Sequence, residues 1–171
     1  MMDVTLQTDR LLLRMFREED LAAYAQICAD PEVMRFLGNG NVLDRAQTWG
    51  QIAWFLGHWA LRGYGMWAVE ERATGELVGR IGFIDPEGWP GFELGWTLRR
   101  SSWGMGFATE GAKRALQYAF EALGRDRVIS LVRPLNAPSI KVAERIGERL
   151  EGEVELFGSK ALVYAAGRNP G

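Results

Sequence analysis

Three short apolar segments with very short connections place the strongest constraint on the fold of this chain. They are YGMWAVEE at 64–71, ELVGRIGFID at 76–85 and GFELGWTLR at 91–99, and each is rich in the residues that strands favour. RATG forms a hairpin turn between the first two segments, and the proline and glycine breakers of PEGWPG separate the second from the third. Because connections this short cannot form a crossover, the three strands must be antiparallel neighbours.

Strand and helix patterns alternate on both sides of these three strands, in the predicted order β-α-α-β-β-β-α-β-α-β-β. We expect one α/β (α+β) domain over residues 1–171. Its sheet is mixed and mostly antiparallel, with six to seven strands and about four helices, and one right-handed βαβ crossover runs through the helix after residue 106. The remaining strands are predicted at 10–16, 127–134, 149–158 and 160–167, the helices at 17–30, 43–63, 107–123 and 136–147, and a short apolar piece with a glycine turn at 31–40.

Composition excludes several classes of function. Hydrophobic residues make up 47% of the 171 residues and charged residues 25%, which is typical of a globular protein. The net charge is −2 and no block of Lys or Arg occurs, so no nucleic-acid partner is expected. With a single cysteine, Cys28, and a single histidine, His58, the chain can form no internal disulfide, and we predict no metal site. Both residues are expected in the core or at its boundary.

The N-terminus, MMDVTLQTDRLLLRMF, has no charged region followed by a long apolar run, and so does not have the pattern of a signal peptide. No apolar stretch approaches the roughly 18 residues that a membrane span needs. We therefore predict a cytoplasmic protein without a membrane partner.

A glycine-rich loop follows the third of the central strands, in RRSSWGMGFATEG at 99–111. Glycines let a ligand approach the backbone, and the first N–H groups of the following helix favour an anion. A dinucleotide fingerprint would need a parallel βαβ unit and an acid at the end of the next strand, whereas Asp126 precedes that strand. No Gly-Lys-Ser/Thr is present, so the loop is not a nucleotide P-loop either.

The segment LGWTLRRSSWGMGFATEGAKRAL at 94–116 resembles the acetyl-CoA-binding motif of the GNAT acetyltransferases. Its WGMGFATEG form is most similar to the branch of the ribosomal-protein N-terminal (RimJ/RimL-type) acetyltransferases. The resemblance extends through TDRLLLRMFREED, DPEVMRFLG and NAPSIKVAERIGERLEGEV, in the expected order. It implies the GNAT fold and an acetyl-CoA-dependent N-acetyltransferase that acts on a primary amine by direct attack in a ternary complex.

The resemblance also implies a coenzyme site. The pyrophosphate would bind backbone amides of the glycine loop and the helix start, the pantetheine arm would lie along the strand before the loop, and the Asn-x-x-Ser pair downstream would contact the arm and the sulfur. Ser101 stands where the family often has Gln or Arg, so Arg99 and Arg100 are expected to supply charge instead. The residues concerned are Trp96, Thr97, Leu98, Arg99, Ser101, Gly104, Met105, Gly106, Phe107, Ala108, Thr109, Asn136 and Ser139.

Acetyl transfer to an amine needs a base for the amine proton and a hydrogen-bond donor for the leaving thiolate. Glu93, on the strand that leads to the loop, is the candidate base, and a solvated strand residue is the alternative for it; Asp85 is a weaker candidate. Ser139 is the candidate acid or donor, and for Asn136 a plain N-cap is the alternative. The family usually has Gly-Phe where this chain has Gly147-Glu148, so we expect altered core packing there or a changed register of the last two strands.

Two other functions stay open at this point. A GNAT-fold domain could bind an acyl-CoA without catalysis, as a sensor or interaction module, and a dinucleotide-binding oxidoreductase is a more distant alternative. The amine acceptor cannot be identified from the sequence, although 34–62, 85–91 and 157–160 are expected to shape its pocket. Monomer and homodimer are both open.

Overall fold

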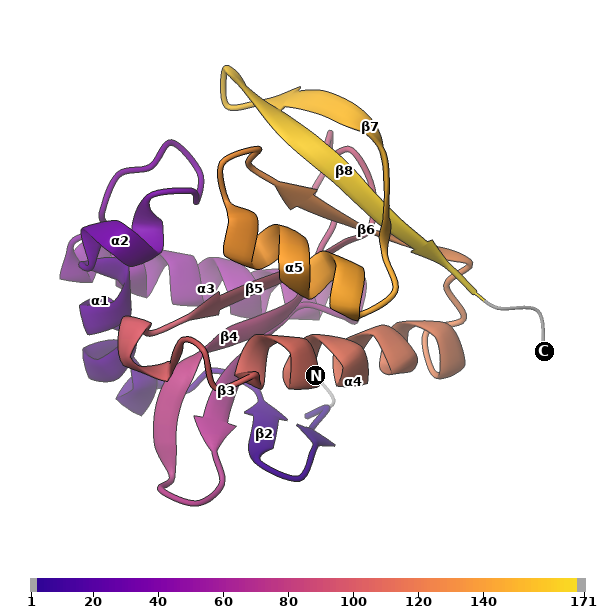
Figure 1. Ribbon diagram of the computed structural model, residues 1–171. Coiled ribbons are helices and arrows are strands. Elements are labelled where there is room, and N and C mark those ends of the chain that lie inside the picture. The colour runs from indigo at the N-terminus through magenta and orange to yellow at the C-terminus, as the bar shows by residue number, and fades with distance from the viewer. Residues whose placement is uncertain (1–2, 169–171) are drawn as a thin grey trace.

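The chain forms an eight-stranded sheet in the computed structural model, which describes residues 3–168. Its order is β1-β2-β3-β4-β5-β6-β8-β7 (Figure 1). Neighbouring strands are antiparallel except β5 and β6, which are parallel. The strands are β1 (Leu6–Gln7), β2 (Leu11–Arg14), β3 (Met66–Glu71), β4 (Glu76–Ile84), β5 (Glu93–Leu98), β6 (Arg127–Val132), β7 (Arg149–Leu156) and β8 (Ser159–Gly167).

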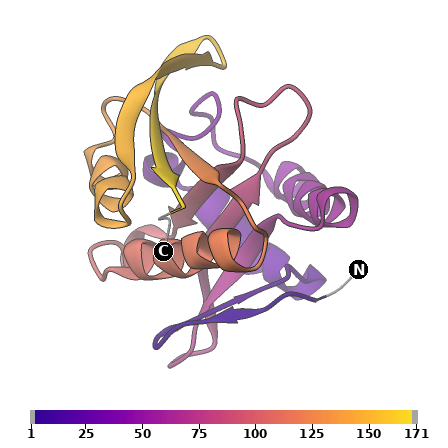
Figure 2. The ribbon, with the colours of Figure 1, turned by 90° about the vertical axis from the view of Figure 1, so that its right-hand side faces the viewer.

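Five α-helices cover the two faces of this sheet (Figures 1 and 2). One face carries the first three helices, which pack through an aromatic cluster that includes Phe16, Tyr24 and Phe55. The other face carries the last two, and the helix between β5 and β6 provides the parallel crossover. The helices are α1 (Leu21–Cys28), α2 (Pro31–Met34), α3 (Arg45–Arg62), α4 (Phe107–Glu121) and α5 (Ala137–Arg145), with short 3-10 turns at Glu18–Asp20 and Arg100–Ser102.

Local sequence signals set the ends of α3. Asp44 and Gln47 form a reciprocal capping box at its start, which satisfies two backbone N–H groups. Gly63 ends the helix with a left-handed φ of 75°, which glycine adopts without strain. The predicted helix at 43–63 is thereby confirmed within one or two residues at each end.

Close packing of α4 on the sheet depends on Gly111. A Cβ atom at this position would lie 2.4 Å from Cδ1 of Ile81 on β4, so a larger residue would require the Ile81 side chain or the helix to shift. Gly111 lies in the second turn of the helix that begins directly after the glycine loop.

The predicted fold class and the antiparallel central strands are confirmed, and the counts are slightly low. The structure adds β1 and α2, which makes eight strands and five helices. β1 has two residues, too few to show an alternating pattern. α2 is one turn that Asp30 caps through the N–H of Glu32, in the segment expected to be a short apolar piece.

Candidate active site

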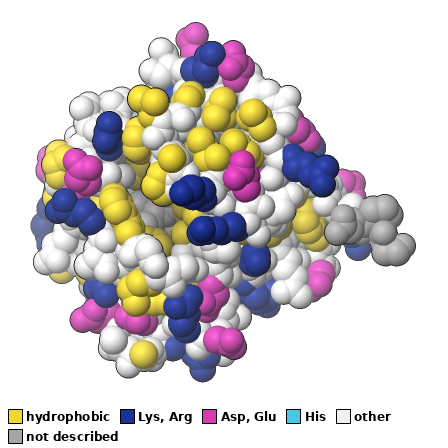
Figure 3. All heavy atoms as spheres, in the orientation of Figure 1, with side chains coloured by type: hydrophobic (Ala, Val, Ile, Leu, Met, Phe, Trp, Pro, Cys, Tyr) yellow, Lys and Arg dark blue, Asp and Glu magenta, His cyan; other side chains and the backbone are white. Residues whose placement is uncertain are grey.

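Strands β5 and β6 separate to form a groove. The paired ladder between them is limited to Glu93 and Ile129, beyond which β5 continues to Leu98 without a strand on this edge. Residues from both strands, the glycine loop, α5 and the α2–α3 connection line a cavity of about 1260 Å³. Apolar side chains gather along the hollow on this face of the molecule, with basic side chains at its margin (Figure 3). The open edge of β5 leaves backbone groups available to an extended ligand.

The glycine loop presents free backbone amides to this groove. Gly104 and Gly106 have left-handed φ values of 75° and 81°, and Gly106 caps α4 without a side-chain acceptor. The N–H groups from Gly104 to Thr109 donate to no acceptor within residues 3–168. All these residues line the groove. A run of unpaired amides at a helix N-terminus fits a phosphate group well.

Arg10 contacts the glycine loop and the start of α4. The sequence did not indicate this role. Arg10 Nη1 donates to the Met105 carbonyl at 2.9 Å, and its guanidinium pairs with Glu110 and lies 4.6 Å from the Phe107 ring centroid. These contacts join residues nearly one hundred positions apart, so no local pattern could reveal them. Arg10 therefore supports the loop, although its own side chain does not line the groove.

The structure does not bring Arg99 or Ser101 to the groove. Arg99 forms an ion pair with Glu76 at 2.9 Å, and its Nε donates to Ser102 Oγ. Ser101 is exposed, and neither residue lines the cavity. Arg100 pairs with Asp30 at 3.1 Å. Basic residues that line the groove come instead from α5, in Lys141 and Arg145, and from Arg35, Arg80 and Arg133.

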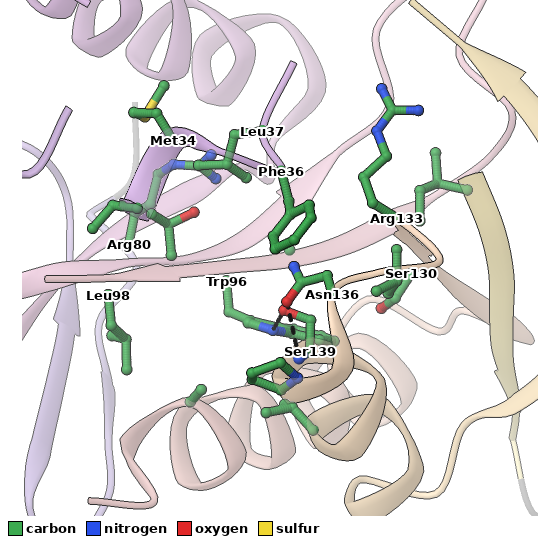
Figure 4. Close-up of a pocket in the computed structure, with 18 of the residues that line it drawn as sticks. Met34, Phe36, Leu37, Arg80, Trp96, Leu98, Ser130, Arg133, Asn136 and Ser139 are labelled. Carbon is green, nitrogen blue, oxygen red and sulfur yellow. Dashed lines mark hydrogen bonds between the residues drawn. The ribbon is translucent and has the colours of Figure 1, made fainter. Parts of the chain in front are cut away.

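Asn136 and Ser139 lie together across from β5. Asn136 caps α5 by accepting a hydrogen bond from the Ser139 N–H at 3.4 Å, as the N-cap alternative predicts. Ser139 Oγ accepts a hydrogen bond from the Trp96 indole at 3.2 Å, which leaves the serine proton free to be donated. Figure 4 shows this cluster on one side of the β5 strand, with Met34, Leu37 and Arg80 on the other.

Glu93 is buried at 9% exposure and lines the groove, so the solvated alternative is wrong. Burial raises the pKa of Glu93 to about 7, although the Trp89 hydrogen bond, the Leu131 amide and the charge of Arg80 act in the opposite direction. The Trp89 indole donates to Glu93 Oε2 at 2.7 Å. A carboxyl group with a pKa near neutrality can both accept and release a proton.

Glu148, which replaces the family's usual phenylalanine, is more deeply buried, at 2% exposure. Ser130 Oγ lies 2.8 Å from the Leu94 carbonyl and 2.9 Å from Glu148 Oε1. The hydroxyl has one proton for these two acceptors, and a protonated Glu148 that donates to Ser130 would satisfy all three groups. Burial raises the pKa of Glu148 to about 8 and the nearby charge of Glu93 adds to this effect, while the Ser130 hydrogen bond acts in the opposite direction.

The predicted departure from the family pattern at Gly147-Glu148 stays a prediction; the structure shows a buried polar contact at Glu148. The pairing of β7 with β8 has an irregularity between Leu150 and Gly152. Both features lie where α5 leads into β7.

The acceptor side of the groove combines three segments predicted to shape it. Met34, Phe36, Leu37 and Trp54 come from 34–62, Trp89 from 85–91, and Phe157 from 157–160. Arg133 joins two of these walls, because it donates to the carbonyls of Gly38, Leu156, Ser159 and Lys160 at 2.9–3.1 Å.

His58 and Asp85 lie outside the residues that line the groove. His58 is buried; its Nδ1 contacts the Tyr64 carbonyl and its Nε2 accepts from the Asp85 N–H, so it bridges backbone groups. Cys28 is buried and free, as expected of a core residue. Over residues 3–168, no group of His, Cys, Asp or Glu side chains has the geometry of a metal site, and no helix is long and apolar enough to cross a membrane.

Known proteins resemble this chain over most of its length. A family profile described as "Acetyltransferase (GNAT) domain" matches residues 10–149. The chain is 33% identical to the uncharacterized N-acetyltransferase p20 of Bacillus licheniformis over 151 residues, which cover 86% of this chain and 84% of p20. The crystal structure of an acetyltransferase from Agrobacterium tumefaciens str. C58 has a TM-score of 0.86 at 35% identity, with 96% of this chain and 95% of that chain covered.

RimJ of Mycobacterium smegmatis, solved in complex with CoA-disulfide, has a TM-score of 0.76 at 24% identity and covers 96% of this chain and 86% of its own. At this identity the likeness is one of fold. The profile match and the more similar relatives above show that the chain belongs to the GNAT family of acetyltransferases.

Proposed function

We propose that the protein transfers the acetyl group of acetyl-CoA to a primary amine by direct attack in a ternary complex. The observation that carries this proposal is Glu93, a buried carboxyl group with a pKa of about 7 that lines the groove where β5 and β6 separate. A general base with a pKa near the working pH is the most effective kind for deprotonating an amine.

The groove has the features that the coenzyme requires. The free amides of Gly104 to Thr109 would bind the pyrophosphate, and the open edge of β5 from Trp96 to Leu98 would pair with the pantetheine arm. The Nδ2 group of Asn136 would donate to the same arm. When bound, acetyl-CoA supplies an activated acetyl thioester.

The remaining chemistry belongs to residues of this chain. As the amine nitrogen bonds to the acetyl carbon, Glu93 accepts the amine proton, and a backbone N–H on the open edge of β5 stabilises the charge that develops on the oxygen. The carbon–sulfur bond breaks with its electron pair on sulfur, and Ser139 donates a hydrogen bond to the thiolate. Trp96 orients that hydroxyl through its indole N–H.

Titration calorimetry with acetyl-CoA, followed by thiol release with a panel of amines and peptides, tests the proposal. We expect coenzyme binding and turnover with at least one class of amine. Binding without turnover on any amine would favour the competing function of an acyl-CoA-binding domain without catalysis. Absence of binding would contradict both.

Gly106→Trp tests the pyrophosphate site separately. The indole would cover the free amides, so coenzyme binding should be abolished while thermal unfolding stays cooperative. Gly75→Trp is the matched control, because Gly75 also has a left-handed φ, 71°, with open space around it, in the β3–β4 turn. Unchanged affinity in Gly106→Trp would contradict the assignment of this loop to the phosphates.

A further inference from the structure

Arg80 lies on the acceptor side of the groove without a carboxylate partner. It belongs to β4, opposite Thr97 of β5, and lines the cavity beside Met34 and Leu37 (Figure 4). Its guanidinium lies 5.3 Å from the Phe55 ring centroid, and Nη1 approaches Met66 Sδ at 3.6 Å. Within residues 3–168, no acidic side chain comes within 4.0 Å of it, and its buried Nε has no hydrogen-bond partner.

Arg14 in the same protein has the opposite arrangement. Arg14, whose side chain is 10% exposed, pairs with both Asp20 and Glu70. Arg80 is partly buried, and a buried N–H group such as its Nε–H is unfavourable without an acceptor, because its desolvation is not offset by a hydrogen bond. At Arg80, an anionic group on a ligand would supply the missing acceptor.

Arg80 and the candidate base share one face of the sheet. In the β4–β5 ladder, Arg80 is opposite Thr97 and Ile84 is opposite Glu93, so the two residues are four positions apart along the strands and one strand apart across the sheet, which places their Cα atoms about 14 Å apart. Both side chains extend into the same cavity, and the positive charge of Arg80 lowers the pKa of Glu93. One ligand in this cavity can therefore contact both groups.

Apolar side chains accompany both groups in the cavity lining. Met34 and Leu37 lie beside Arg80, and Ile84 is opposite Glu93 in the ladder, so part of the acceptor is expected to be apolar or aromatic (Figure 4). A guanidinium matches a planar carboxylate through two parallel hydrogen bonds.

We propose that the acceptor is a primary amine with a carboxylate group, which Arg80 binds while the amine lies at Glu93. This inference rests on the proposed acetyl transfer and names its substrate class: a free amino acid, or a short peptide with an accessible carboxylate. The free amino acid and the short peptide share the two groups that would be recognised, the primary amine and the carboxylate.

Matched amine pairs test it. Phenylalanine against phenylalaninamide, and glycylphenylalanine against its amide, differ in the carboxylate and separate the free amino acid from the peptide. With rates expressed per neutral amine, we expect kcat/KM of the wild type to favour the carboxylate member by about 10- to 100-fold, the usual strength of a charge-assisted hydrogen bond. Equal or better turnover of the amides would overturn the inference.

Arg80→Met should reduce this carboxylate preference to about one. Arg125→Met is the matched control, because Arg125 also lies over aromatic rings, at 4.3 Å from Phe92 and 4.8 Å from Tyr64, and also has a buried Nε without a partner, but does not line the groove. A preference retained in Arg80→Met, or lost equally in Arg125→Met, would contradict the role of Arg80.

Binding of the reaction products separates this inference from the proposed function. Titration of CoA-saturated protein with N-acetylphenylalanine and with its amide requires no turnover. If no amine is acetylated but the carboxylate product binds through Arg80, the anion site stands and the acetyl transfer fails. If the amine panel is turned over without carboxylate preference, the transfer stands and the anion site fails.

Discussion

Two glutamates, Glu93 and Glu148, are buried near the point where β5 and β6 separate, and their surroundings give them different capacities. Glu93 points to the sheet face that carries α3, lines the groove and accepts a hydrogen bond from Trp89. Glu148 follows α5 on the other face, does not line the groove, and contacts the Ser130 hydroxyl, which also contacts the Leu94 carbonyl. Burial raises both pKa values, yet Glu93 alone combines a donor for its charged form with access to the groove. Glu93 can exchange a proton, whereas Glu148 retains one.

The largest effect is expected from Glu93→Gln, which removes the one of the two buried glutamates that can exchange a proton. Without a general base, kcat should fall by about 10²- to 10⁴-fold. Acetyl-CoA affinity should change little, because the amide keeps the shape of the side chain. In the wild type, the rate should rise with pH up to about 7, where Glu93 loses its proton. A variant with the wild-type pH–rate profile would remove Glu93 from the mechanism.

Glu148→Gln should affect stability in a pH-dependent way. The folded-state pKa of Glu148 is raised from 4.5 to about 8, so its contribution to stability is complete below about pH 4.5 and is lost as pH rises toward 8. The loss amounts to roughly 3–5 kcal/mol and is absent in the variant. The measurement is urea unfolding of both proteins at about pH 5 and about pH 9.

The variant should therefore be the more stable protein at the higher pH and no more stable at the lower one. Glu155→Gln, at an exposed position on β7, is the control and should follow the wild type at both. Parallel stability curves for the wild type and Glu148→Gln would show that Glu148 is ionised in the folded protein.

A smaller effect is expected from Ser130→Ala, which removes the group that links Glu148 to Leu94. The variant leaves two buried polar groups without a partner, so unfolding free energy should fall by about 1–3 kcal/mol. In a double-mutant cycle with Glu148→Ala at about pH 5, the two losses should not add, because both variants remove the same contact. Strictly additive losses would mean that the hydroxyl and the carboxyl act independently.

The smallest effect is expected from Trp89→Phe, which keeps the ring but removes the hydrogen bond to Glu93. That bond lowers the pKa of Glu93, so its loss should move the acidic limb of the pH–rate profile to higher pH by about one unit or less. Trp54→Phe, at another groove position without a bond to Glu93, is the control. An unmoved limb would indicate that Trp89 contributes packing alone.

Features set by local sequence were predicted well, because strand alternation, caps and glycine turns depend on neighbouring residues. The central strands, the amide-lined loop and the Asn136 cap belong to this group. Features set by tertiary contacts were not predicted. The sequence does not show that Glu93 is buried, that Glu76 holds Arg99 away from the groove, or that Arg10 supports the loop, because each depends on residues from another element.

Arg133 has a consequence for how acceptor specificity can change in this protein. Its guanidinium binds carbonyl oxygens of the α2–α3 connection and of the β7–β8 hairpin, and all four acceptors are main-chain atoms. Substitutions in these two walls can therefore alter the surface offered to the acceptor without removing the contacts that hold the walls together. In a redesign of acceptor specificity, the side chains of these two walls can be substituted while the backbone contacts stay in place, provided that Arg133 is kept.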